Sequence, residues 1–169
     1  MLSFLPKIIL PELTKLEPEL LQARGIELLM LDFDNTMLPY TSNTPSQELL
    51  CWLEKMQQSG IQLCIVSNSK KPRVSQFGKT YGVDVITHAR KPASRGIRQC
   101  LQRYGIDRTH AALCGDQIYT DVLGANLAGV YAIQVPSILN HNFWLKLRHV
   151  AELPFLFFAR GRRISYEKS

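Results

Sequence analysis

Leu28-Leu29-Met30-Leu31-Asp32-Phe33-Asp34-Asn35-Thr36 joins an apolar run directly to two carboxylates that are one residue apart. A short apolar run bounded by polar residues indicates a buried strand of a parallel sheet. Side chains alternate along a strand, so Asp32 and Asp34 point the same way while the strand geometry lasts. Two unpaired buried carboxylates are costly, so this pair favours a bound cation. An N-cap and turn that close a strand would give the same pattern, and the rest of the chain has to separate the two interpretations.

The composition is that of an ordinary soluble globular protein. The chain has 169 residues, which suits a single domain over residues 1–169 with a full hydrophobic core. Hydrophobic residues make up 46% and charged residues 20%, which are usual proportions for this class. The formal charge of +6 favours anionic partners, namely phosphorylated substrates, acidic membrane surfaces or nucleic acid.

The four cysteines predict no disulfide framework. Cys64 and Cys114 lie in apolar, strand-like runs, and the sequence contains no Cys-x-x-Cys pair, which fits a reducing cytoplasm. Residues 1–11 are apolar but interrupted by prolines and lack a basic region, so they do not resemble a signal peptide. No apolar run approaches the length of about 20 residues that a transmembrane helix needs. We therefore expect a cytoplasmic protein.

Strand-like and helix-like segments alternate along the chain. The predicted strands cover residues 26–33, 61–66, 83–86, 111–114 and 130–135, and the predicted helices cover residues 11–23, 46–58, 72–81, 92–104 and 119–128. This alternation predicts the α/β class, with a doubly wound, mainly parallel sheet of five strands and right-handed crossovers. Lys91-Pro92 is expected to open the fourth helix, with the proline in its first turn.

The C-terminal segment has a different character. Apolar residues recur there at helical spacing, at Phe143, Trp144, Leu147, Val150 and Ala151. An aromatic run over residues 153–158 is then followed by Arg160, Arg162 and Arg163. A terminal helix packed on the sheet with a basic end would give this pattern, and so would a peripheral contact with a membrane.

Polar residues that can carry chemistry stand at or near the ends of the predicted strands. They are Asp32 and Asp34 after the first strand, Ser67 and Asn68 after the second, Lys91 after the third, and Asp116 and Asp121 after the fourth. Because the carboxyl ends of parallel strands share one edge of the sheet, these groups are expected to converge on one crevice. Phosphoryl transfer needs this set of groups: a nucleophile, a divalent cation and positive charge for the phosphate oxygens.

This ordered set resembles the motifs of the haloacid dehalogenase superfamily of phosphatases, over about residues 26–135. The first motif is similar to residues 32–36, the second to residues 67–68, the third to residues 91–92 and the fourth to residues 115–121. The resemblance implies that Asp32 is a nucleophile that forms an aspartyl-phosphate. It implies that Asp34 is the general acid and base, which fits the phosphatases of the superfamily better than its ATPases or dehalogenases.

The resemblance also implies how the substrate and a metal are held. Ser67, Asn68 and Lys91 would bind the phosphoryl group. Mg²⁺ would be coordinated by Asp32, by the backbone carbonyl of Asp34 and by Asp116. Asp121 would support the metal through water or through Lys91.

The substrate is open at this stage. The gap between the first and second motifs and the gap between the second and third are both too short for a cap domain. In this respect the chain resembles the capless third subclass of the superfamily. As a short basic chain, it resembles the YqeG-like branch of that subclass. That branch is related to mitochondrial-type phosphatidylglycerophosphate phosphatases, so the resemblance implies a lipid phosphomonoester in phosphatidylglycerol synthesis. The apolar N-terminus and the aromatic-basic tail suit an enzyme in peripheral contact with the anionic inner face of a membrane, and they suit a packed core as well. A nucleic-acid partner is not favoured, and the oligomeric state is left open. The alternatives are a soluble sugar phosphate, a nucleic-acid end, or a binding module with vestigial activity.

Overall fold

The computed structural model of the chain describes residues 3–138. The predictions for Phe143 to Arg163, a packed helix or a membrane contact, concern residues outside the described range. The single domain expected over residues 1–169 stays a prediction, because it includes residues outside this range.

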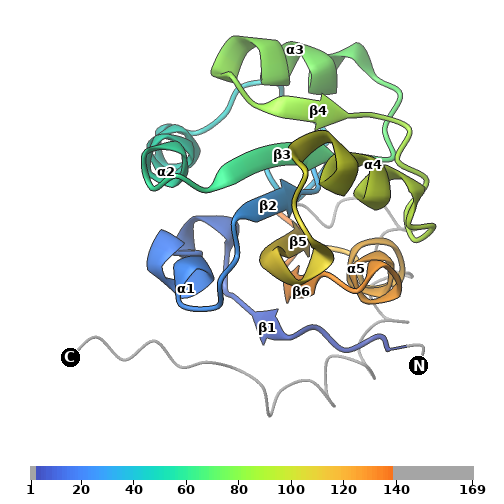
Figure 1. The fold of residues 1–169 in the computed structure, drawn as a ribbon. Helices are drawn as coiled ribbons and strands as arrows, with labels where there is room; N and C mark the ends of the chain where they lie inside the picture. The colour runs from blue at the N-terminus through green and yellow to red at the C-terminus, as the bar shows by residue number, and fades with distance from the viewer. Residues whose placement is uncertain (1–2, 139–169) are drawn as a thin grey trace.

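A parallel sheet forms the centre of the described part of the chain (Figure 1). Its strands are β1 (Ile8–Ile9), β2 (Leu28–Leu31), β3 (Gln62–Val66), β4 (Asp84–Ile86), β5 (Ala111–Gly115) and β6 (Tyr131–Gln134). They are arranged in the order β1-β6-β5-β2-β3-β4, and each neighbouring pair is parallel. The chain therefore winds outward from β2 in both directions, which confirms the doubly wound α/β class.

The predicted count of five strands is wrong by one, because β1 adds a sixth at the edge beside β6. Pro6 and Pro11 flank this strand, so the sequence shows no run long enough to predict it. Its backbone is nevertheless paired on both sides of the two strand residues. Lys7 N donates to Ala132 O at 2.8 Å, and Leu10 N donates to Gln134 O at 2.9 Å.

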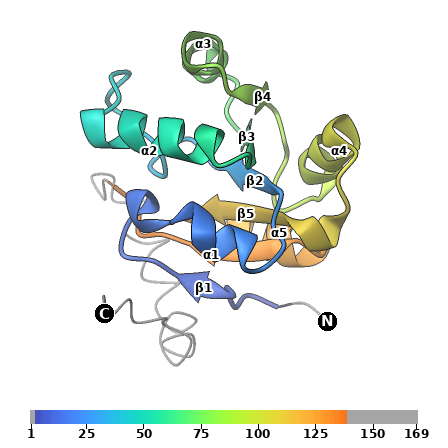
Figure 2. The same cartoon turned by 60° about the vertical axis from the view of Figure 1, so that its left-hand side comes forward.

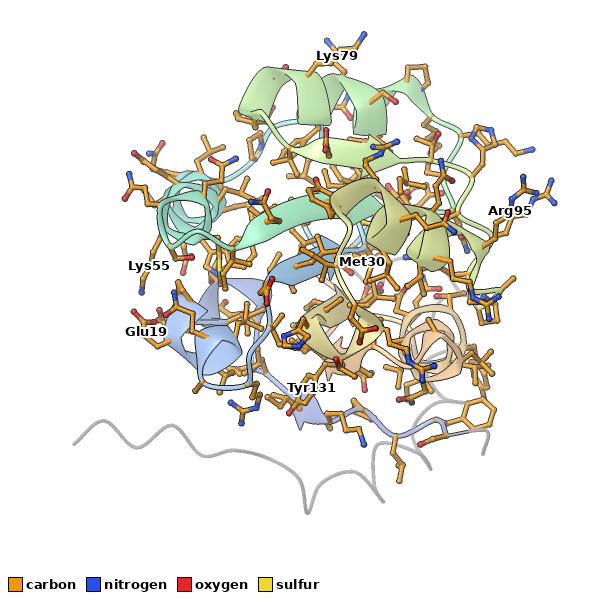
Figure 3. All side chains as sticks on the ribbon, viewed as in Figure 1. Glu19, Met30, Lys55, Lys79, Arg95 and Tyr131 are labelled. Carbon is orange, nitrogen blue, oxygen red and sulfur yellow. The ribbon has the colours of Figure 1, made fainter. Side chains whose placement is uncertain are left out.

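Helices cover both faces of the sheet, as Figures 1 and 2 show. One face of the sheet is covered by η1 (Leu13–Lys15), α1 (Pro18–Gln22), α2 (Gln47–Gln58) and α3 (Pro72–Tyr81). The other face is covered by α4 (Arg95–Tyr104), η3 (Ile118–Val122) and α5 (Leu123–Ala128). The short helix η2 (Arg108–His110) leads into β5. A hydrophobic core lies on each face of the sheet, and the side chains of β2 alternate between the two. Leu29 and Leu31 pack in the core on the first face, and Met30 packs in the core on the second. In Figure 3, Met30 lies in the interior, whereas Lys55 and Lys79 extend outward from their helices.

Three predicted helices differ from the observed ones. The predicted helix 11–23 is split into η1 and α1, because the residue before Pro18 is disfavoured in the helical region and Glu17 is extended at φ −85° and ψ 142°. The predicted helix 92–104 begins only at Arg95, so Pro92 precedes the helix. The predicted helix 119–128 starts with one π-helical turn, η3, before α5.

The connections between the central strands are short. Residues between β2 and β3 form a loop and α2, and those between β3 and β4 form α3 with its flanking turns, so the described chain carries no cap domain there. Within residues 3–138, no helix combines the length and the apolar character needed to cross a membrane.

Candidate active site

Four of the polar residues predicted to converge, Asp32, Lys91, Asp116 and Asp121, meet at the carboxyl edge of the two central strands. β2 and β5 are neighbours, with Leu31 opposite Cys114, and Asp32 N donates to Cys114 O at 2.9 Å. Asp32 follows β2 and Asp116 follows β5. The strand order reverses between these two strands, and this is where open α/β sheets bind ligands.

Lys91 is the buried cation of the site. Its Nζ lies 2.7 Å from Asp32 Oδ1 and 2.7 Å from Asp121 Oδ1, and its side chain is 1% exposed. Burial by itself lowers the pKa of Lys91, but Asp121 and Asp32 raise it by more, so the pKa lies above its ordinary value. Lys91 therefore remains an ammonium in this position.

The side chain of Asn68 fixes the backbone of Lys91. Asn68 Oδ1 accepts from Lys91 N at 2.7 Å, and Asn68 Nδ2 donates to Lys91 O at 2.9 Å. These two bonds hold the loop after β4 against the loop after β3. The structure thus gives the Asn68 side chain a contact with Lys91, while its predicted phosphate contact stays a prediction.

The π-helical turn η3 brings Asp121 into the site. Gln117 O accepts from both Asp121 N at 2.9 Å and Val122 N at 3.3 Å, which widens the turn. Asp121 Oδ2 in turn accepts from Gln117 N at 3.0 Å. Gly115 makes room for this carboxylate, because a Cβ there would lie 2.4 Å from Asp121 Cγ.

Three buried carboxylates cluster at the site, and two of them, Asp32 and Asp121, contact the Lys91 ammonium. One oxygen each from Asp32, Asp116 and Asp121 lies within 4.8 Å of the others. Burial raises the pKa of Asp32 to about 6 against the opposing effect of Lys91. Burial and the charges of Asp121 and Asp32 raise the pKa of Asp116 to about 8. With three acids and one ammonium, the cluster carries excess negative charge, and its oxygen donors fit a hard divalent cation such as Mg²⁺.

Asp34 lies apart from that cluster, in the turn after β2. Asn35 bends the chain there with φ 62°, and Asn35 N donates to Leu38 O at 2.7 Å. Asp34 Oδ1 is buried and has no hydrogen-bond partner among the described residues. The nearest recorded cationic atom is Arg73 Nη2, at 3.7 Å.

The structure thus brings Asp32, Lys91, Asp116 and Asp121 together, with Asn68 behind Lys91. Ser67 directly follows β3, as predicted, and its hydroxyl accepts from Ser69 N at 3.1 Å. Thr36 lies in the first motif, but no role was predicted for it from the sequence. Thr36 Oγ1 is 3.4 Å from Asp32 Oδ2 and 3.2 Å from Asp116 Oδ1. Arg73 was not predicted to lie near the site either, because no sequence pattern marks it.

Comparison with known proteins identifies the family. The family model described as "Mitochondrial PGP phosphatase" matches residues 2–138. This chain belongs to that family. It also shares 32% identity over 135 residues with "Probable phosphatase YqeG" of Bacillus subtilis (strain 168), covering 80% of this chain and 78% of the relative.

Solved structures agree with the fold. The cobalt-bound deoxy-D-mannose-octulosonate 8-phosphate phosphatase YrbI of Haemophilus influenzae has a TM-score of 0.53 at 12% identity, covering 74% of this chain and 75% of that one. The 3-deoxy-D-manno-octulosonate 8-phosphate phosphatase of Moraxella catarrhalis, solved with a magnesium ion, a phosphate ion and KDO, has a TM-score of 0.50 at 20% identity, covering 85% and 97%. Together with the family match, these findings show that the chain is a phosphatase of the haloacid dehalogenase type.

Proposed function

We propose that the chain is a Mg²⁺-dependent phosphomonoesterase that works through an aspartyl-phosphate on Asp32, and that its substrate is phosphatidylglycerophosphate. The observation that carries the chemistry is the placement of Asp32 at the switch point of the sheet, 2.7 Å from a buried ammonium and within a carboxylate cluster. The substrate is supported by the family description and by the formal charge of +6.

The reaction has two steps. Asp32 attacks phosphorus and the ester P–O bond breaks, while Asp34 in its acid form gives a proton to the leaving oxygen. Asp34, now a carboxylate, then takes a proton from water, and the water oxygen attacks phosphorus and releases Asp32. Lys91 offsets the repulsion between the Asp32 carboxylate and the phosphate throughout.

The donor set fits Mg²⁺. Asp32 and Asp116 would hold the ion together with the backbone carbonyl of Asp34, and Asp121 would support it through Lys91. Bound there, Mg²⁺ would supply positive charge that stabilises the transferring phosphoryl group.

The experiment is a phosphate-release assay on the full chain. Phosphatidylglycerophosphate in vesicles is compared with a soluble sugar phosphate and a 5′-phosphorylated oligonucleotide, with Mg²⁺ and with EDTA. We expect Mg²⁺-dependent release and the highest kcat/KM with the lipid, and loss of release in Asp32→Asn, which keeps the side-chain volume. Undiminished activity of Asp32→Asn would refute the nucleophile, and a soluble ester turned over better than the lipid would refute the substrate.

A further inference from the structure

Arg73 reaches from one element of the fold into the turn that carries Asp34. It lies in the first turn of α3, yet its Nη1 donates to Tyr40 O at 2.7 Å and its Nη2 donates to Pro39 O at 3.0 Å. The same Nη2 is 3.7 Å from Asp34 Oδ1. A single guanidinium thus connects α3, the loop after β2 and the carboxylate of Asp34.

The other recorded bonds of this turn shape its backbone and do not reach that carboxylate oxygen. Asn35 Oδ1 accepts from Tyr40 N at 3.1 Å, and Met37 N donates to Phe33 O at 3.0 Å. Asp34 Oδ1 has no hydrogen-bond partner within residues 3–138. Arg73 is therefore the group across the fold that is placed to orient it.

The environment of Arg73 explains why this position suits arginine. Its side chain is 12% exposed, and the guanidinium carbon lies 5.1 Å from the ring centroid of Phe33. A buried cation is costly unless it is paired and hydrogen-bonded. The planar fork binds two carbonyls and a ring face while its charge still faces Asp34, and a lysine ammonium cannot make all of these contacts.

We propose that Arg73 is a positioning residue for the acid–base step, holding Asp34 toward the leaving-group oxygen. The inference rests on the proposed function of Asp34 as the general acid. Because acid–base groups act only at close range, a displacement of about 1 Å can cost on the order of 10²-fold in rate. Arg73 thus acts on the reaction through Asp34, without contacting the phosphate.

The test uses the dependence on the leaving group. An alkyl phosphomonoester needs protonation of its leaving oxygen, whereas 4-nitrophenyl phosphate has an activated leaving group and needs little. We expect Arg73→Ala to lower kcat/KM for the alkyl ester by roughly 10- to 100-fold and for the nitrophenyl ester by less than about 5-fold. Arg73→Lys should show the same selectivity with a smaller loss, and it carries the test if Arg73→Ala does not fold.

Lys71→Ala is the matched control. It removes one positive charge from the same segment, and Lys71 Nζ lies over the ring of Tyr40 at 4.0 Å from its centroid. We expect it to leave the ratio of the two kcat/KM values unchanged, which would show that charge near the loop is not enough.

Three results would overturn the proposal. Equal losses with both esters, with or without a fall in Tm, would make Arg73 structural. A rise in KM with unchanged kcat would make it a substrate-binding residue. An equal change in the ratio of the two kcat/KM values in Lys71→Ala would assign the effect to positive charge near the loop. In each of these cases the wild type still hydrolyses both esters and Asp32→Asn does not. Failure of the proposed function itself would instead appear as an inactive wild type or an active Asp32→Asn.

Discussion

The position of Lys91 depends on one amide side chain, which offers a sharp test at the scale of a residue. Asn68→Ala would leave the Lys91 N–H and C=O without their partners, at a cost of about 1–3 kcal/mol in the free energy of unfolding. The ammonium would lose its fixed position, so kcat/KM should fall by about 10- to 100-fold. Steady-state kinetics with parallel melting curves would measure both effects. Gln99→Ala, an exposed amide on α4, is the control and should change neither quantity.

Asp116 gives a prediction about pH. Its pKa is raised to about 8 by burial and by Asp121 and Asp32, whereas an aspartate in the unfolded chain has a pKa of about 4. Between these values the folded state retains a proton that the unfolded state has lost. Without a divalent cation, this residue therefore lowers the free energy of unfolding as pH rises, by up to about 1.4 kcal/mol per pH unit.

Urea denaturation in EDTA between pH 5 and pH 8 would measure this slope. Asp116→Asn cannot ionise there, so its curve should be flatter than that of the wild type, most clearly between pH 5 and pH 7. Mg²⁺ should stabilise the wild type more at pH 8 than at pH 5, because at pH 5 it competes with the bound proton. Parallel curves for the two proteins in EDTA would contradict the raised pKa of Asp116.

At the scale of elements, β1 is short but well anchored. Ile8 is 1% exposed and packs in the core with α1 and α2, whereas Ile9 on the same strand is half-buried. Ile8→Ala should therefore lower the free energy of unfolding by about 2–4 kcal/mol, and Ile9→Ala by clearly less. Urea denaturation of the two variants checks this, and kcat of the folded variants should stay near that of the wild type. Equal losses of unfolding free energy in the two variants would contradict the burial of Ile8 and the partial exposure of Ile9.

The sequence predicted β2, β3, β5 and β6 because each is a short apolar run inside the parallel sheet, with a neighbouring strand on both sides. It also predicted β4, at the edge of the sheet, from residues 83–86. It also predicted that Asp32, Lys91, Asp116 and Asp121 would meet, because parallel strands present their carboxyl ends at one edge. β1 could not be predicted, since its stability comes from pairing with β6 and not from its own length. The contacts of Arg73 could not be predicted for a similar reason. Its partners lie 33 and 34 residues earlier and meet it only in the folded chain.

At the scale of the whole molecule, the net charge bears on the proposed lipid substrate. The chain carries 20 basic and 14 acidic residues. Within residues 3–138, the connections between the central strands form no cap domain. Both features are compatible with a phosphomonoester that stays in a lipid layer during hydrolysis.

The last prediction concerns the contact with that layer. The sequence places aromatic residues next to basic ones near its end, at Phe155, Phe157 and Phe158 and at Arg160, Arg162 and Arg163. Each basic residue near an anionic surface contributes about 1 kcal/mol to binding, and aromatic rings favour the interface. We expect the full chain to float with phosphatidylglycerol vesicles and not with neutral ones, and added salt should weaken this binding.

Replacing the three arginines with glutamine should weaken vesicle binding by about 3 kcal/mol at low ionic strength, at about 1 kcal/mol per charge. The same variant should lose turnover of the vesicle-bound lipid but hydrolyse soluble 4-nitrophenyl phosphate like the wild type, because the proposed catalytic groups lie within residues 32–121. The matched control replaces Arg95, Arg98 and Arg103 on α4 with glutamine and so removes the same charge elsewhere. Equal losses of vesicle binding in both triple variants would assign the effect to net charge alone and refute a role specific to the C-terminal segment.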